Sequence, residues 1–255
     1  MERFKENEIK YLAGLLDADG SLSFKFCKSG DKTYVYLILA LTASESIDKR
    51  GYIKSLGERV GSVCKIEYEK ETYSSAWKWH VQKRTDLDQL LPRLLKHMVI
   101  KAKHWQSLYN KFTELKGLDV TNRVEELKEF STRSRKDTGP LKPKKHPTWA
   151  WVAGYLDGDG CYTMSRKAMH IGVIAHVDDV CALELLFKAF GGSIYDPQPD
   201  NTRLWRHGAG ISQSSFAKMF LNGVVKHSRL KKHKIEQMLS FHNQPQRLNE
   251  SNAKA

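Results

Sequence analysis

Hydrophobic and polar positions follow one another along the chain with two spacings. Apolar residues at every third or fourth position predict helices, whereas strict alternation predicts strands with one buried face. The polar run Ser29-Gly30-Asp31-Lys32 predicts a turn between two of these strands. In chain order, the first half is predicted to form a helix at 11–20, strands at 21–27 and 34–43, a helix at 48–60, strands at 64–69 and 76–82, and helices near 86–96 and 101–115.

The second half repeats this order of elements. Each half therefore reads α-β-β-α-β-β-α-α, and antiparallel hairpins mixed with helices indicate an α+β fold. The predicted elements are a helix at 151–160, strands near 162–167 and 170–176, a helix at 179–190, strands near 193–196 and 202–210, and helices near 212–221 and 229–241.

The two halves also share a short sequence. Residues 11–20 read YLAGLLDADG and residues 151–160 read WVAGYLDGDG, which align without a gap. Similarity in sequence together with the same downstream order indicates an internal duplication. We therefore predict two domains, at 1–117 and 148–255, joined by a basic linker at 118–147. Residues 131–148 are rich in Ser, Thr, Lys and Pro, which favours an exposed connection.

Small residues recur within the shared sequence. On a helix, Ala13, Gly14 and Ala18 lie along one side, and Ala153, Gly154 and Gly158 do so in the second copy. Glycine inside a helix costs roughly 1 kcal/mol relative to alanine, so its use in both copies indicates a contact that a larger side chain would obstruct. Small residues allow two helix backbones to approach closely. We therefore expect the two motif helices to pack together and to end side by side.

Each motif helix ends in an aspartate, Asp19 or Asp159. A carboxylate there faces the negative end of the helix dipole, and a second carboxylate nearby adds repulsion. Mg²⁺ bound by oxygen ligands would relieve both effects, and the backbone carbonyls of Ala18 and Gly158 are expected as free helix-end acceptors that join the ligand set. Metal held in this way can support hydrolysis of phosphodiesters. The alternative is that each Asp-Gly pair merely ends a helix. The preceding aspartates, Asp17 and Asp157, are expected to be structural.

Composition and charge add a candidate partner. The formal net charge is +13, and basic residues outnumber acidic ones in both halves and in the connector, which favours a polyanion bound along an extended face.

The four cysteines are scattered without a C-x-x-C pair, which argues against a disulfide framework or a zinc ribbon. No apolar run approaches the roughly 18 residues of a membrane span. The N-terminal residues resemble neither a signal nor a transit peptide. We expect an intracellular, non-secreted protein of an organelle that encodes it (chloroplast or mitochondrion), of a bacterial cytoplasm, or of a phage.

The repeated motif, YLAGLLDADG and VAGYLDGDG, resembles the motif that names the LAGLIDADG homing endonucleases. The resemblance covers nearly the whole chain, because the element order is also that of the family. It implies two pseudo-symmetric α-β-β-α-β-β-α domains with the motif helices at their interface and two antiparallel sheets that form a saddle over DNA. It further implies that Asp19 and Asp159 bind metal, Mg²⁺ with Mn²⁺ able to substitute. The implied activity is cleavage of both strands of a long, asymmetric target, with short 3′ overhangs, by a monomer that needs no protein partner.

The resemblance carries over to further positions. Family members place a basic residue at the start of the last long helix of each domain, which matches Lys101 and Lys231, where an ammonium could offset charge on the reacting phosphate. A water-positioning residue after the second strand matches Glu45 in the first half and Ala175 or His176 in the second, although none of these is the usual glutamine. The sheets are expected to contact DNA, but only one parity of each strand can face it. The candidate DNA-binding residues are Lys25, Lys28, Lys32, Lys65, Lys78, His80, Arg166, Lys167, Arg203 and Arg206.

Two other functions fit the same pattern. An RNA-binding intron maturase would also use basic sheets, with intron RNA as partner and with or without nuclease activity, so charge does not discriminate between the two. A non-catalytic DNA-binding regulator on this fold would be expected to lack the motif acids or to carry an added helix-turn-helix. The presence of both Asp19 and Asp159 favours DNA cleavage.

Overall fold

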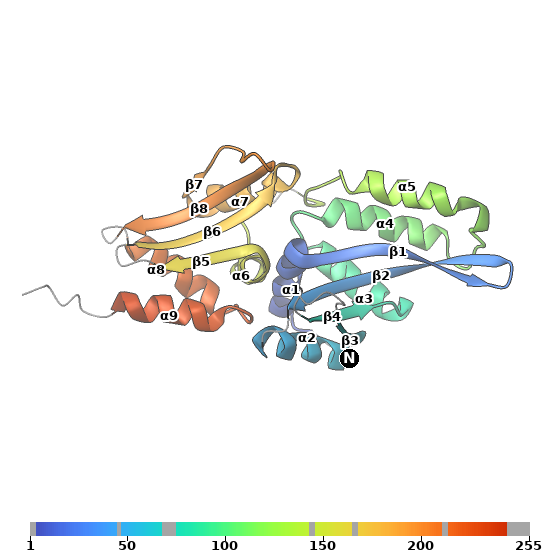
Figure 1. Ribbon diagram of the computed structural model, residues 1–255, viewed down its shortest axis with the longest axis horizontal. Coiled ribbons are helices and arrows are strands. Elements are labelled where there is room, and N and C mark those ends of the chain that lie inside the picture. The colour runs from blue at the N-terminus through green and yellow to red at the C-terminus, as the bar shows by residue number, and fades with distance from the viewer. Residues whose placement is uncertain are drawn as a thin grey trace, which may run out of the picture.

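The computed structural model describes residues 4–44, 47–67, 75–142, 146–164, 168–210 and 214–243, and it contains two halves of similar build that lie side by side (Figure 1). Each half has one four-stranded antiparallel sheet with helices packed against it. The predicted α+β class and the repeated order of elements are confirmed. The first half contains α1 (Glu6–Asp19), β1 (Gly20–Ser29), β2 (Lys32–Ser44), α2 (Ile47–Arg59), β3 (Ser62–Ile66), β4 (Ala76–Val81), α3 (Arg84–Leu95) and α4 (Ala102–Glu114).

The second half follows the same plan. Its sheet has the strand order β5-β6-β8-β7, which matches β1-β2-β4-β3 in the first sheet. In both sheets the hairpin that follows the motif helix supplies the first two strands, and the second of them pairs with the fourth strand of its half. The elements are α6 (Trp149–Asp159), β5 (Gly160–Met164), β6 (Ala168–His176), η2 (Val177–Asp179), α7 (Val180–Phe190), β7 (Ser193–Ile194), β8 (Thr202–Gly210), α8 (Ser214–Val225) and α9 (Lys232–Asn243).

Alternation along the strands gives each sheet a covered face and an open face. In β2, Leu37, Leu39 and Leu41 are fully buried or nearly so, and they point toward the helices. The helices α2, α4 and α5 (Val124–Ser134) contact the first sheet, and α7 and α8 contact the second. Trp79 and Trp205 occupy matching positions on the covered faces, since each pairs with the residue of the second strand that lies opposite the glycine opening the first.

The two motif helices, α1 and α6, pack against each other and form the contact between the halves. A Cβ on Gly14 would collide with the backbone carbonyl of Trp151, and a Cβ on Gly154 would collide with that of Tyr11. The helix backbones are therefore in direct contact, which confirms the expectation drawn from the small residues. Both motif aspartates end up at the same end of this helix pair.

The segment 118–147 differs from the predicted linker. It contains η1 (Thr121–Arg123) and α5 (Val124–Ser134), and α5 packs on α4 and β1. Leu127 is fully buried, and the buried Ser134 bonds to His104 at 3.0 Å, so part of this segment packs on the first half, while residues 132, 133 and 135–137 are exposed. Composition did not reveal this helix because its buried face is narrow and its other residues are polar. The domain boundaries at 117 and 148 stay a prediction.

Candidate active site at the domain interface

Asp19 and Asp159 are the last residues of α1 and α6. Both reach the surface. A Cβ built on Gly158 would lie 3.2 Å from Oδ2 of Asp19 and against the side chain of Ala18, so the carboxylate of one copy lies beside the end of the other motif helix. The two halves thus bring the motif aspartates together, as the sequence predicts.

The proximity of the two acids is visible in the electrostatics of Asp159. Burial raises the pKa of its carboxyl to about 6, with repulsion from Asp19 as the second cause, while Lys101 and Lys231 act in the opposite direction. The side chain is nevertheless more than a third exposed, so water screens part of this effect. The arrangement favours a bound cation or proton, because either relieves the repulsion between the carboxylates.

Lys101 and Lys231 close the ends of the motif helices. The Nζ of Lys101 donates to the carbonyls of Leu16, Ala18 and Gly20 at 3.2, 2.8 and 2.9 Å. The Nζ of Lys231 donates to the matching carbonyls of Leu156, Gly158 and Gly160 at 2.9, 2.9 and 2.6 Å. An ammonium has three N–H donors, and in each lysine all three donate to carbonyls at the negative end of a helix dipole.

This geometry corrects one expectation. The carbonyls of Ala18 and Gly158 are not free acceptors, because each takes a hydrogen bond from a lysine. A carbonyl oxygen keeps a second lone pair, so a role as metal ligand stays a prediction. Burial lowers the pKa of the Lys101 ammonium, and the nearby carboxylates of Asp17, Asp159, Asp179 and Asp19 oppose this shift.

Asp17 and Asp157 are buried and each accepts several hydrogen bonds, which confirms their predicted structural role. Each lies one turn or less before the end of its motif helix and accepts backbone N–H bonds from the segment that leads into the last long helix of its own half. The donors to Asp17 are the amides of Val99 at 2.6 Å, Ile100 at 3.2 Å and Lys101 at 2.9 Å. Those to Asp157 are the amides of Arg229 at 2.7 Å, Leu230 at 2.9 Å and Lys231 at 3.2 Å, with the hydroxyl of Ser228 at 2.7 Å.

These bonds explain a difference in helix boundaries. The spacing predicts a helix at 229–241, but α9 begins at Lys232. The amides of residues 229–231 point at the Asp157 carboxylate, which holds this stretch outside the helix and places a negative charge at its N-terminus. Burial raises the pKa of Asp17, and the amides of Lys101 and Val99 together with the Trp151 indole oppose the shift.

Each of these buried aspartates also accepts a hydrogen bond from a side chain of the opposite half. The hydroxyl of Tyr11 donates to Asp157 at 2.7 Å, and Nε1 of Trp151 donates to Asp17 at 2.9 Å. Tyr11 and Trp151 are the first residues of the two aligned motif copies. Sequence reasoning missed these two residues, although their shared position and their shared ability to donate one hydrogen bond were readable signals.

The donor set around Asp19 and Asp159 fits a hard divalent cation. The described residues hold no cluster of three or more His, Cys, Asp and Glu that could bind a metal. An ion between these two acids would therefore complete its coordination with water, backbone oxygen or oxygens of a bound phosphate. Mg²⁺ is commonly held in this way, by one or two carboxylates plus substrate phosphates and water.

The candidate water-positioning residues do not form a matched pair. Glu45 lies outside the described residues. Strand pairing places Leu41 opposite Gly20 and Val173 opposite Gly160, so His176 matches Ser44 and not Glu45. His176 is exposed and accepts a bond from the Asp178 amide at 3.3 Å. The one-residue offset comes from the glycine-to-strand register, which a sequence without pairing information does not reveal.

The candidate DNA-binding residues of the first sheet divide between its two faces. Lys25 lies opposite Tyr36, and His80 and Lys78 lie opposite Ala40 and Thr42, all with the parity of the open face. Lys32 shares this parity at the tip of the hairpin. Lys28 and Lys65 have the opposite parity, that of Phe26 and Trp79, and Lys65 pairs instead with Glu67 at 2.9 Å.

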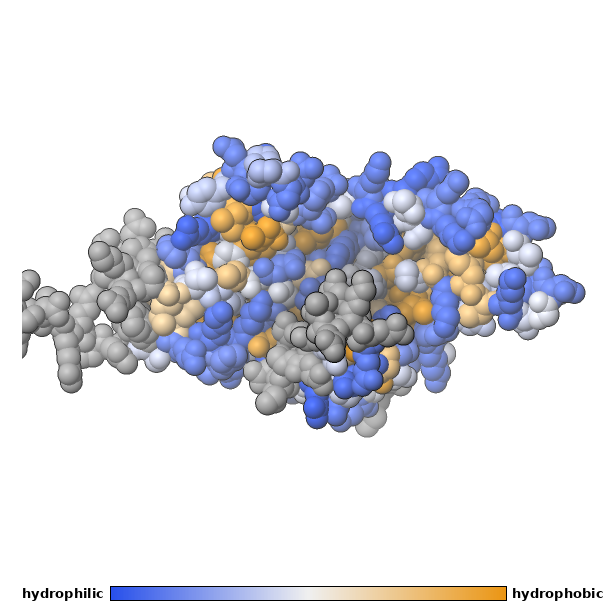
Figure 2. Space-filling view, viewed as in Figure 1, coloured by the Kyte–Doolittle hydropathy of each residue, from blue (hydrophilic) through white to orange (hydrophobic). Residues whose placement is uncertain are grey.

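The second sheet divides in the same way. Arg206 lies opposite Gly172 on the open face, whereas Arg203 lies opposite Ala175 on the covered face. Arg166 and Lys167 lie outside the described residues. The open face of this sheet also presents Ile174, which is 57% exposed, and His170. In the view of Figure 2 the surface is mostly hydrophilic, with hydrophobic residues gathered in patches between hydrophilic side chains.

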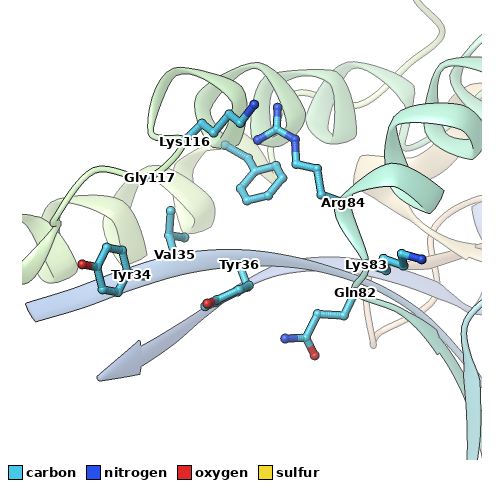
Figure 3. A pocket seen from close by; sticks show the side chains of 9 residues that line it. Tyr34, Val35, Tyr36, Gln82, Lys83, Arg84, Lys116 and Gly117 are labelled. Carbon is cyan, nitrogen blue, oxygen red and sulfur yellow. The ribbon is translucent and has the colours of Figure 1, made fainter. Parts of the chain in front are cut away.

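A hollow of about 490 Å³ lies at the edge of β2 beyond the point where β4 stops pairing with it (Figure 3). Three basic residues, Lys83, Arg84 and Lys116, belong to its lining, and Arg84 lies over the Phe112 ring at 4.7 Å. Sequence reasoning singled out none of these cations, because they come from a strand end and a helix end that are distant along the chain. The remaining lining residues are Tyr34, Val35, Tyr36, Gln82 and Gly117.

Comparisons with known proteins identify the fold. No protein-family model matches the chain, and no curated protein matches it by sequence. Among solved structures, I-SmaMI bound to an uncleaved DNA target with calcium ions is 16% identical, with a TM-score of 0.65 and coverage of 92% of this chain and 90% of that one. The LAGLIDADG meganuclease I-AabMI bound to uncleaved DNA is 14% identical, with a TM-score of 0.66 and the same coverage. The LAGLIDADG homing endonuclease I-GzeII in complex with its DNA target is 13% identical, with a TM-score of 0.59 and coverage of 92% and 96%.

The chain therefore has the two-domain, single-chain fold of the LAGLIDADG homing endonucleases, as the motif resemblance predicts. The match spans nearly all of both chains, so neither half is missing a counterpart. Within the part of the chain that the structure describes, no helix is long and apolar enough to span a bilayer.

Proposed function

We propose that this protein is a site-specific endonuclease that hydrolyses both strands of double-stranded DNA with divalent metal held between Asp19 and Asp159. The observation that carries the proposal is the packing of α1 against α6, which sets two carboxylates at one end of the domain interface. Its support from the comparisons is that several chains of the same fold were solved with DNA targets. A short 3′ overhang and a long, asymmetric target belong to the same proposal.

The residues present would divide the work in a simple way. Asp19 and Asp159 would hold Mg²⁺, or Mn²⁺ in its place. When bound, the divalent ion supplies activation of water and stabilisation of the departing oxygen. Lys101 and Lys231 hold the ends of α1 and α6 through three carbonyls each, which fixes the carboxylates and offsets the negative helix ends.

DNA would lie across the open faces of both sheets. Lys25, Lys32 and Lys78 would contact phosphates of one half of the target, and Arg206 would serve the other half. The cations around the hollow at the β2 edge extend the positive charge of the first sheet. Side chains that reach base edges in the major groove would read the sequence, and phosphate contacts would make binding sensitive to salt.

The experiment uses the full chain and a library of random duplexes. Duplexes retained by the protein are incubated with Mg²⁺, with Mn²⁺ or with EDTA, and the ends of cut molecules are sequenced. We expect one family of related targets, cut in both strands with either metal and uncut with EDTA. Asp19→Asn and Asp159→Asn are expected to bind the same targets and to cut at least ~10³-fold more slowly, since metal activation contributes several kcal/mol to such reactions.

Asp31→Asn, in the exposed turn between β1 and β2, is the matched control and is expected to cut like the wild type. Retention of one family of targets without cleavage in either metal would contradict the catalytic proposal and favour a DNA-binding regulator. Failure to retain any duplex, together with binding of a structured RNA, would favour a maturase. Unchanged cleavage by both Asp→Asn variants would overturn the assignment of the site.

A further inference from the structure

Among the described residues, two side-chain hydrogen bonds join the motif helices α1 and α6 across the domain interface, and both end on a buried aspartate. Tyr11 in α1 donates to Asp157 in α6, and Trp151 in α6 donates to Asp17 in α1. Tyr11 and Trp151 are 1% exposed, and Asp17 and Asp157 are 2% and 0% exposed. Hydrogen bonds to a carboxylate away from water are among the strongest in proteins.

The glycines of the motif account for the reach of these bonds. A Cβ on Gly154 would meet the carbonyl of Tyr11, and one on Gly14 would meet that of Trp151. Each aromatic residue therefore sits directly on the other motif helix. Its side chain can then extend along that helix to the aspartate near its end. The shared order of aromatic, glycine and aspartate in both copies produces two crossed bonds.

Each buried aspartate also binds the backbone of the segment that carries the lysine of its own half. Asp157 accepts the amides of Arg229, Leu230 and Lys231, and the ammonium of Lys231 then holds the last carbonyls of α6. A continuous set of bonds therefore runs from Tyr11, in the first half, to the end of the helix that carries Asp159. The mirror set runs from Trp151, in the second half, through Asp17 and Lys101 to the end of α1.

We propose that Tyr11 and Trp151 are crossed positioning residues, each of which orients the lysine-bearing segment in the half of the molecule to which it does not belong. This inference rests on the proposed function, because it assigns a role at the same pair of aspartates. Tyr11 sets the arrangement around Asp159, and Trp151 sets the arrangement around Asp19. A substitution of either residue in one half therefore alters the active centre of the other half first.

The first arm of the test measures backbone amide hydrogen exchange in the full chain without DNA. Tyr11→Phe removes only the hydroxyl, so Asp157 loses one donor and the amides of 229–231 are expected to exchange roughly tenfold faster, the effect of one bond to a charged group. The amides of 99–101 are expected to stay unchanged. Trp151→Phe is expected to show the opposite pattern, with faster exchange at 99–101.

Two control variants separate a lost bond from a lost side chain. Tyr162→Phe removes a buried hydroxyl that has no hydrogen-bond partner among the described residues, so neither segment is expected to change. Trp79→Phe removes an indole of the same size whose Nε1 bonds to the Val60 carbonyl at 2.7 Å, away from the interface. Neither control is expected to distinguish 99–101 from 229–231.

The second arm follows each DNA strand separately on a target that the wild type cuts. Tyr11→Phe and Trp151→Phe are expected to shift the ratio of the two strand-cutting rates in opposite directions, by roughly threefold to tenfold. A general loss of stability would slow both strands equally and would not move this ratio. If the wild type cuts DNA and neither variant moves the ratio, the crossed roles are overturned.

The two arms keep the two proposals apart. Exchange that changes at 99–101 in Tyr11→Phe, or that changes at neither segment, contradicts the crossed bonds whether or not the chain is a nuclease. A wild type that cuts no duplex defeats the proposed function, and the exchange pattern then reports on the bonds alone. Opposite exchange patterns together with opposite strand ratios support the proposal.

Discussion

The two halves of the molecule agree closely where the motif helices end and differ where those ends meet the rest of the surface. Lys101 and Lys231 each hold three carbonyls, and Asp17 and Asp157 each accept three consecutive amides. The flanks of these centres are not matched. Arg229 stands where the first half has Val99, and it lies over the rings of Tyr11 and Tyr52 at 5.7 and 5.8 Å.

Other differences between the halves also lie around the matched helix ends. Tyr155, at the position of Leu15, stacks on Trp151 with ring centroids 5.0 Å apart. Ser228, at the position of Met98, adds a hydroxyl donor to Asp157 that Asp17 lacks in its own half. On the open faces, Lys78 of the first sheet has no basic match in the second, where exposed Ile174 stands opposite Leu204.

The comparison shows which features a duplicated fold has to keep. The three backbone amides, the aspartate that accepts them and the lysine that holds the helix carbonyls recur in both halves, because both centres depend on the same helix ends. The surfaces that would meet DNA are free to differ, and they do. An asymmetric target, with its two halves read by different side chains, is what such a pair of sheets would bind.

The largest test concerns the buried aspartates. Replacing Asp157 with asparagine removes a charge that accepts bonds from three amides, Ser228 and Tyr11, whereas Asp17→Asn affects one donor fewer. Leaving such donors poorly paired costs about 1–3 kcal/mol each, so we expect a loss of unfolding free energy of about 3 kcal/mol or more for Asp157→Asn and somewhat less for Asp17→Asn. Urea unfolding measures both. Equal unfolding free energies of the wild type and both variants would contradict the claim that these aspartates stabilise the fold.

The motif glycines give the next largest effect. Gly14→Ala places a methyl group into the carbonyl of Trp151, which overpacks the interface and is expected to cost about 1–3 kcal/mol of unfolding free energy. Gly154→Ala is expected to behave alike, since its contact is the mirror image. Gly51→Ala in α2 is the control, because nothing lies within 4 Å of its Cβ and alanine should there stabilise the helix by up to about 1 kcal/mol. Stabilisation by Gly14→Ala would show that α1 and α6 are not in contact.

The strand parity makes a smaller prediction about DNA. Lys78 lies on the open face of the first sheet, whereas Lys65 has the parity of the covered face. Lys78→Ala is expected to weaken DNA binding by up to about tenfold and to lower the slope of affinity against salt by about 1. Lys65→Ala is expected to leave both quantities nearly unchanged. Fluorescence anisotropy over a range of salt concentrations measures the difference, and the reverse ranking would place DNA on the other face.

The smallest effect is on pH dependence. Burial, then Asp19, raises the pKa of Asp159 from 3.8 to about 6, so without metal the folded chain binds this proton more tightly than the unfolded chain. This contribution to stability is fully present below about pH 4 and is lost as the pH rises through about 6. With EDTA present, Asp159→Asn is expected to raise the melting temperature by roughly 1–3 °C at pH 7.5 and to leave it unchanged at pH 4, since exposure of the side chain screens the effect. A gain of the same size at both pH values would show that the carboxyl is not responsible.

Much of this architecture was readable from the sequence, and the reasons are specific. Alternation and helical spacing identified the strands and helices, and the repeated Gly14 and Gly154 identified the helix pair. The hidden features all depend on partners distant along the chain. The crossed bonds of Tyr11 and Trp151, the lysine contacts to helix carbonyls and the packing of α5 each join residues that no local pattern connects. Face assignment for Lys28, Lys65 and Arg203 likewise needed the strand register.

The most direct test of the metal site counts bound ions on the protein–DNA complex by electron paramagnetic resonance of Mn²⁺. With the full chain on its selected target, we expect the wild type to take up Mn²⁺ that Mg²⁺ displaces. We expect the double variant Asp19→Asn/Asp159→Asn to bind the same DNA and to take up none of these ions, while Glu125→Gln, in α5, behaves like the wild type. Equal uptake by the wild type and the double variant would contradict the claim that the paired motif aspartates hold the metal.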